Sequence, residues 1–202
     1  MPSRPLPNRV DPFGELRATP SRGSLMGNRG GRFHTDDQTL SRRRWTSRLW
    51  IVCLCEFKQR HREVWGRGYT ELFFLDEPTA FSAGHRPCFE CRRAEALAFR
   101  AAFPSSRPLS APEMDEKLHA ERLDGSRKRT HMAALDGLPD GTMIARGASA
   151  FAVRGETLLP WSFAGYGAPL PRPRGDAEVL TPPSIVAGLA NGYAPRWAEL
   201  AY

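Results

Sequence analysis

The feature that most constrains this chain is the placement of its four cysteines in two close pairs. Cys88 and Cys91 have C-x2-C spacing, and Cys53 and Cys55 lie upstream in an apolar stretch. A C-x2-C turn brings two sulfurs to one side of the backbone, so that both can bind one metal ion. The two pairs together therefore predict one zinc site with four thiolate ligands, Cys53, Cys55, Cys88 and Cys91.

The upstream half of this site has alternatives. Residues i and i+2 of a strand share a face, which would let Cys53 and Cys55 reach the same ion. If only one of them binds, His34 is the next candidate ligand, with His61 and His85 behind it. A zinc ion with four protein ligands has no open position, so the predicted zinc is structural.

The composition indicates a folded protein in a reducing compartment. The chain has 202 residues, of which 41% are hydrophobic, enough for one substantial core. No apolar run is long enough to cross a bilayer, so no membrane partner is expected. The N-terminus shows no apolar stretch typical of a secretion signal, which favours a cytoplasmic location. In that compartment, paired cysteines indicate metal ligands more than disulfides.

The positive charge is concentrated in the first third of the chain. Residues 1–68 contain 14 Arg and Lys against 6 Asp and Glu, whereas residues 69–202 contain 15 against 16. Arginine supplies 26 of the 29 basic residues. Guanidinium groups bind phosphates with two hydrogen bonds and stack on bases. The clustering therefore favours nucleic acid as a partner, while the arginine bias alone is equally well explained by a GC-rich genome.

The segment from Phe73 to Arg92 resembles the second half of the Ada-type metal-binding domain, which is named after a bacterial DNA-repair protein and also occurs fused to nucleases. The shared pattern is a strand ending in Phe, a short acidic and alanine-rich helix, and Gly-aromatic-Arg-Pro-Cys-x-x-Cys-Arg. This chain has His85 at the aromatic position. The resemblance implies a zinc–thiolate site that includes Cys88 and Cys91, with flanking arginines available to DNA. It does not extend to the upstream ligands.

The order of elements predicts an α+β fold in three segments. Residues 1–32 form a basic Gly/Pro/Arg arm, which stays mobile or lies extended against a partner. Residues 33–103 form a small zinc-stabilised antiparallel β unit with short helices. Residues 112–202 form a second small β-rich unit, an α+β unit with a β-meander.

Within these segments, an apolar strand is expected over residues 48–57, with residues 62–65 as the returning arm of a hairpin. A second buried strand is expected over residues 69–75. Helices are predicted over 79–83, 92–103, 112–123 and 185–190, and meander strands over 142–144, 150–153 and 157–159.

These observations give a leading function and two alternatives. The leading prediction is a zinc-containing nucleic-acid-binding protein of DNA repair or processing, with DNA favoured over RNA by the resemblance alone. The first alternative is a nuclease or base-modifying enzyme with structural zinc, and the second is a zinc-stapled protein-interaction module. No catalytic residue is predicted, because the chain lacks the common hydrolase and phosphate-loop motifs. The predicted phosphate contacts are Arg32, Arg42, Arg43, Arg44, Arg48, Arg60, Arg62, Arg86, Arg92 and Arg93.

Overall fold

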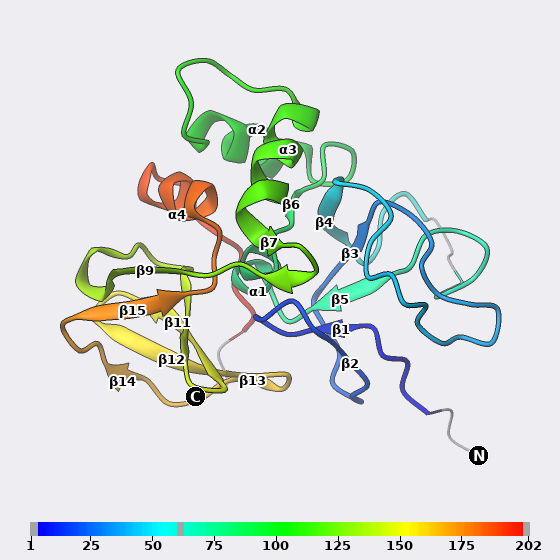
Figure 1. The fold of residues 1–202 in the computed structure, drawn as a ribbon, viewed down its shortest axis with the longest axis horizontal. Helices are drawn as coiled ribbons and strands as arrows, with labels where there is room; N and C mark the ends of the chain where they lie inside the picture. The colour runs from blue at the N-terminus through cyan, green and yellow to red at the C-terminus, as the bar shows by residue number, and fades with distance from the viewer. Residues whose placement is uncertain (1–3, 60–62, 200–202) are drawn as a thin grey trace.

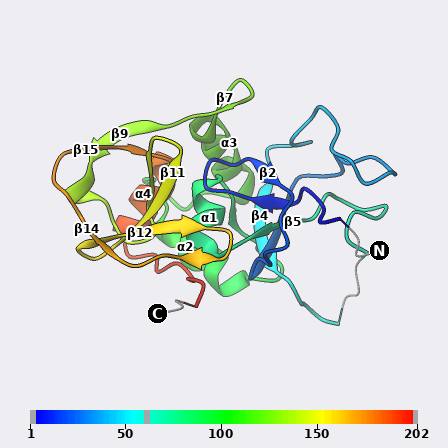
Figure 2. The same ribbon diagram turned by 90° about the horizontal axis from the view of Figure 1, so that it is seen from below.

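Two β-sheets lie on either side of a central group of helices in the computed structural model, which describes residues 4–59 and 63–199 (Figures 1 and 2). This arrangement confirms the predicted α+β class. Among the described residues, no helix combines the length and the apolar character that a membrane crossing requires.

The first sheet contains six strands in the order β2-β1-β5-β3-β4-β6. β3 pairs antiparallel with both β4 and β5, while β6 runs parallel to β4. The bounds are β1 Arg9–Val10, β2 Leu16–Arg17, β3 Leu25–Arg29, β4 Trp50–Leu54, β5 Leu72–Phe74 and β6 Arg86–Pro87.

Residues 9–29, assigned to the basic arm by sequence, supply three strands of this sheet. All five residues of β3 are buried. Gly27 lets β3 approach β4 closely, because a Cβ at this position would lie 2.2 Å from the Ile51 carbonyl oxygen. By sequence this glycine belongs to the basic arm, whereas in the structure it allows close packing of a central strand.

The predicted hairpin between residues 48–57 and 62–65 is not formed. β4 takes β3 as its antiparallel partner instead. Residue 62 lies outside the described part of the chain, and residues 63–65 are not in a strand. Trp65 has a φ of 60° and donates its indole N–H to the Glu71 carbonyl, 3.0 Å away. This apolar residue fills the core from a loop.

The helices form where the sequence predicts them. In α1, the Asp76 carboxylate caps the N-terminus by accepting from the Thr79 N–H at 3.0 Å. In α3, Ser110 and Glu113 form a capping box. Phe81, Phe99 and Met114 pack in the core between the helices. The bounds are α1 Glu77–Ser82, α2 Arg93–Ala102, α3 Ala111–Arg122 and α4 Pro183–Ala190.

The second sheet follows the order β13-β12-β11-β10-β15-β9, with β14 paired to β12. The antiparallel β10-β11-β12 pairing confirms the predicted meander. A separate two-stranded hairpin, β7-β8, follows α3. The bounds are β7 Leu123–Asp124, β8 Arg127–Lys128, β9 His131–Ala134, β10 Met143–Arg146, β11 Ser149–Arg154, β12 Thr157–Ser162, β13 Gly165–Tyr166, β14 Leu170–Pro171 and β15 Asp176–Val179.

Polar contacts at the start of α1 connect it to the second sheet. Tyr166 donates its hydroxyl to Asp76 at 2.8 Å, and Trp161 donates its indole N–H to Thr79 at 3.0 Å. Tyr193, beyond α4, donates to Glu77 at 2.8 Å. The short helix that precedes the cysteine turn is thus held by residues far along the chain.

Candidate metal centre

The backbone positions Cys88 directly beside β4. β6 pairs in parallel with β4 through Ile51–Arg86 and Val52–Pro87, and the Cys88 N–H donates to the Val52 carbonyl at 3.0 Å. Proline at the end of β6 is compatible with this edge strand because it needs no donor there. The turn then leads into α2, so that Cys91 comes back toward the same strand.

Three sulfurs meet at this point, from Cys53 on β4 and from Cys88 and Cys91 on the turn. They all lie within 4.8 Å of one another. Zinc–sulfur bonds of about 2.3 Å in a tetrahedron place neighbouring sulfurs about 3.8 Å apart. The three sulfurs are therefore close enough for one metal ion to bind them all. Cys53 and Cys88 are buried, while Cys91 is partly exposed.

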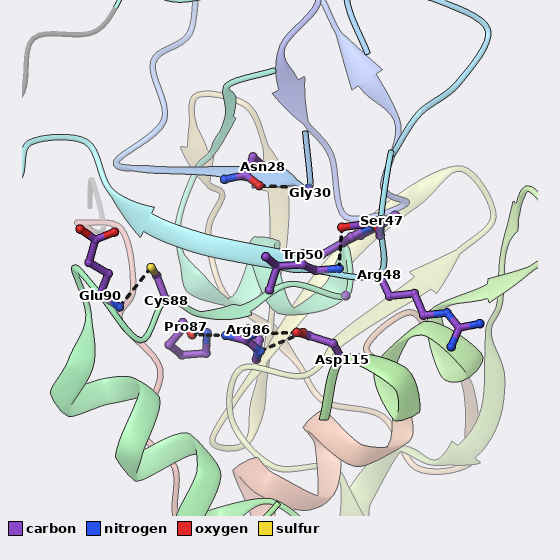
Figure 3. A network of polar contacts seen from close by, with 12 residues as sticks. Asn28, Gly30, Ser47, Arg48, Trp50, Arg86, Pro87, Cys88, Glu90 and Asp115 are labelled. Carbon is purple, nitrogen blue, oxygen red and sulfur yellow. Dashed lines mark hydrogen bonds and ion pairs between the residues drawn. The ribbon is translucent and has the colours of Figure 1, made fainter. Parts of the chain in front are cut away.

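Hydrogen bonds favour the thiolate, the form that binds metal, at two of the three cysteines, Cys88 and Cys91. The Glu90 N–H points at the Cys88 sulfur at 3.4 Å (Figure 3). A hydrogen bond from Cys53 is the main cause that lowers the pKa of Cys88 to about 5. The same thiol lowers the pKa of Cys91, with help from the Leu54 backbone. In return, the contacts with Cys88 and Cys91 raise the pKa of Cys53.

Cys55 is not part of the cluster. β4 ends at Leu54, so the i, i+2 rule for strands does not carry over to Cys55. Its side chain is exposed, and its sulfur lies 3.5 Å from the Ser24 carbonyl. The structure therefore brings together three of the four predicted thiols, and the fourth, just past the end of β4, lies outside the cluster.

Two of the candidate histidines, His34 and His85, also lie elsewhere. His34 is buried, bonded to the Thr70 hydroxyl at 2.8 Å and stacked on Trp65. His85 is buried between the rings of Trp50 and Phe74. Neither belongs to the ligand cluster found among the described residues. His61 falls outside the part of the chain that the structure describes.

The two arginines that flank the cysteines point inward. Arg86 makes two hydrogen bonds to Asp115, of 2.8 and 2.7 Å, with both side chains almost fully buried (Figure 3). Arg92 forms an ion pair of 2.7 Å with Glu77, and these side chains are 0% and 1% exposed. The structure thus places both predicted phosphate contacts in internal ion pairs.

Most of the other predicted arginines are at the surface. Arg48 extends from the chain near α3 (Figure 3). It pairs with Glu116, and 59% of its side chain is exposed. Arg60 and Arg62 are outside the described residues. The exposed members of the predicted set are Arg32, Arg42, Arg43, Arg44, Arg48 and Arg93.

Sequence reasoning missed a buried cationic cluster around Trp50, the residue that begins β4. Arg29 and Arg122 are 2% and 1% exposed, and both stack on Trp50. No motif marks them, because they come from the end of β3 and from the end of α3, 93 positions later.

Comparison with known protein families, curated proteins and solved structures finds no match for this chain.

Proposed function

We propose that this chain is a cytoplasmic zinc–thiolate protein that binds nucleic acid, with DNA the favoured partner, in repair or processing. The cluster of Cys53, Cys88 and Cys91 supports a metal centre. The resemblance of residues 73–92 to the Ada-type domain supports zinc and DNA.

The observation that carries the proposal is an exposed arginine loop, residues 42–48, between β3 and β4. Arg42, Arg43 and Arg44 are exposed, and Trp45 beside them is partly exposed. Together with Thr46 and Ser126, they line a concave surface with a volume of about 350 Å³. Arginines that bind phosphates and an indole that stacks on a base are the two elements of single-strand recognition.

The structure joins this loop to the metal centre through two strands. The Thr46 N–H donates to the Arg29 carbonyl at 3.0 Å, which anchors the loop at the end of β3. β4, which follows the loop, carries Cys53. A metal bound at Cys53 would fix β4 to the turn before α2 and so hold the base of the loop. In this role the metal is a scaffold and contacts no nucleic acid.

Fluorescence anisotropy with labelled single-stranded DNA at several salt concentrations tests this proposal. Phosphate contacts release counterions, so affinity is expected to fall steeply as salt rises. The Arg42→Ala/Arg43→Ala variant should reduce the slope of log affinity against log salt by about two. Arg146→Ala/Arg174→Ala, which removes the same charge from exposed positions near the second sheet, should leave it unchanged.

Absence of binding at low salt, or equal slopes for the two double variants, would contradict nucleic-acid binding by the arginine loop. An RNA of the same sequence gives the comparison that decides between the two nucleic acids. Tighter binding of the RNA would overturn the preference for DNA.

One observation favours a second candidate, an enzyme that processes nucleic acid. The described residues supply three ligands at the cluster, and catalytic zinc sites characteristically have three protein ligands and one open position. X-ray absorption of the zinc protein distinguishes the two cases. A fourth sulfur or nitrogen neighbour supplied by the chain indicates a closed, structural site, whereas three sulfurs with one oxygen support the enzyme. Strand cleavage that depends on the metal would then establish it.

A further inference from the structure

A small cavity lies next to the arginine loop and is lined in part by the buried Trp50. Its volume is about 40 Å³, room for roughly three water molecules. Glu15, Arg44 and Ser126 are exposed where they line it, so the cavity opens to the surface at that end. The cationic and tryptophan side chains that line it are Arg29, Arg44, Trp45, Trp50, Arg122 and Lys128.

Two of these cations are held in place by stacking. The guanidinium carbons of Arg29 and Arg122 lie 4.1 and 3.9 Å from the centre of the Trp50 ring. Arg29 donates to the Gly14 carbonyl at 2.9 Å, and Arg122 donates to the Gly84 carbonyl at 2.9 Å. These contacts fix the orientation of both groups, as a preformed binding site requires.

The carbonyl contacts satisfy hydrogen bonds but supply no negative charge. Within the described residues, no carboxylate forms an ion pair with Arg29, Arg122 or Lys128. Buried cations are normally paired with an anion, because an uncompensated buried charge is costly. Among the described residues, Glu15 is the one acidic residue that lines the cavity, against four cations, while Asp11 and Asp115 act on Arg29 and Arg122 without lining it.

Two further observations indicate that this positive charge is only partly compensated. The Arg122 Nε is buried and has no hydrogen-bond partner in the described structure. Burial lowers the pKa of Lys128 to about 7, and repulsion from Arg29 and Arg122 adds to the effect, while Asp11 opposes it. Burial likewise lowers the pKa of Arg29 and of Arg122. The negative charge of a bound anion would oppose these downward shifts in pKa.

We propose that this cavity binds a phosphate-class oxyanion between Arg29, Arg44, Arg122 and Lys128. A phosphate group carries a charge of about −1.5 to −2 and three oxygens that accept strong hydrogen bonds. Guanidinium groups match such oxygens in geometry, and charge-assisted bonds are the strongest available here. The cavity is too small for a nucleoside, so it takes the phosphate group alone. This site does not depend on nucleic-acid binding by the arginine loop.

Isothermal titration calorimetry of the full-length zinc-loaded protein with inorganic phosphate tests the site, with chloride balancing the ionic strength. Lys128→Met and Arg44→Ala are each expected to weaken phosphate binding about tenfold. Arg174→Ala, an exposed arginine outside the cavity, should bind as the wild type does. Arg44 is exposed, so its replacement leaves the fold intact even if Lys128→Met proves unstable. Absence of phosphate binding above the chloride background, or equal affinity in all variants, would overturn the site.

A second titration identifies the source of the phosphate. Oligonucleotides of one sequence, with a 5′-phosphate or a 5′-hydroxyl, are compared on the wild type and on Lys128→Met. Tighter binding of the phosphorylated strand, lost in Lys128→Met, assigns the site to a nucleic-acid end. Equal binding of the two strands, with inorganic phosphate still bound, assigns it to a free phosphate. If neither strand binds, the proposal that the arginine loop binds nucleic acid fails. The titration with inorganic phosphate then still tests whether the cavity binds phosphate.

Discussion

Arg86 and Asp115 form a two-point ion pair in which both side chains are at least nine-tenths buried, 3% and 6% exposed. The pair joins the turn that carries Cys88 to the middle of α3. Arg86, which the sequence motif predicts to contact DNA, thus connects the cysteine turn to α3. It positions the cysteine turn from outside the metal centre.

We expect Asp115→Ala to lower the free energy of unfolding by about 3–5 kcal/mol, because it leaves the Arg86 charge buried without a partner. Urea denaturation followed by circular dichroism measures this loss. The neighbouring Glu116→Ala is the matched control, since the Arg48–Glu116 pair is 59% and 72% exposed. Its expected cost is about 0–1 kcal/mol. Similar losses for the two variants would contradict a structural role for the buried pair.

Gly84 is required by its contact with Arg122. Its φ is +79°, and a Cβ there would lie 2.5 Å from Arg122 Cδ and 2.8 Å from Arg122 Cβ. Gly84→Ala therefore combines backbone strain with a clash, and we expect it to cost at least about 2 kcal/mol more than strain alone. Thermal or urea unfolding of the purified variants provides the comparison.

Gly125→Ala isolates the strain, because Gly125 also has a positive φ of +61° but no atom within 4 Å of its Cβ position. That variant should cost about 1–2 kcal/mol. If Gly84→Ala and Gly125→Ala lower the free energy of unfolding by the same amount, the packing of Arg122 against Gly84 does not contribute to stability.

The lowered pKa of Lys128 should make the stability of the folded chain depend on pH. Burial lowers its pKa in the folded chain to about 7, from 10.5 when unperturbed. Between these two values the unfolded chain binds the proton more tightly, so the contribution of Lys128 to stability rises with pH. The wild type should therefore gain stability relative to Lys128→Met as pH rises from 7 to 10 in phosphate-free buffer. Urea denaturation at several pH values measures the difference, and a difference that does not change with pH would refute the burial of this charge.

The sequence predicts regular elements and the downstream half of the metal centre because both depend on local patterns. Apolar runs and capping residues place α1, α2 and α3 within two residues of their observed bounds. The C-x2-C spacing brings Cys88 and Cys91 together through a single turn. These features need no knowledge of contacts between distant residues.

The remaining features depend on long-range pairing. Cys53 and Cys55 look equivalent in sequence, and only the end of β4 at Leu54 separates them. Arg86 and Arg92 resemble surface arginines until Asp115 and Glu77 are seen to pack against them.

The same limit applies to the N-terminal segment and the buried cations. Residues 9–29 show no strong periodicity, yet they form strands of the first sheet. β3 lies between β4 and β5 and pairs with both of them. Arg29 and Arg122 meet at Trp50 only in the folded chain.

The zinc content of the purified protein and of its four single Cys→Ser variants tests the account most directly. We expect one zinc per chain in the wild type and in Cys55→Ser. Cys53→Ser, Cys88→Ser and Cys91→Ser should lose the metal, because each removes one of the three clustered sulfurs. A wild-type protein that folds without zinc, or a Cys55→Ser variant that loses it as fully as Cys88→Ser does, would contradict the three-thiolate centre.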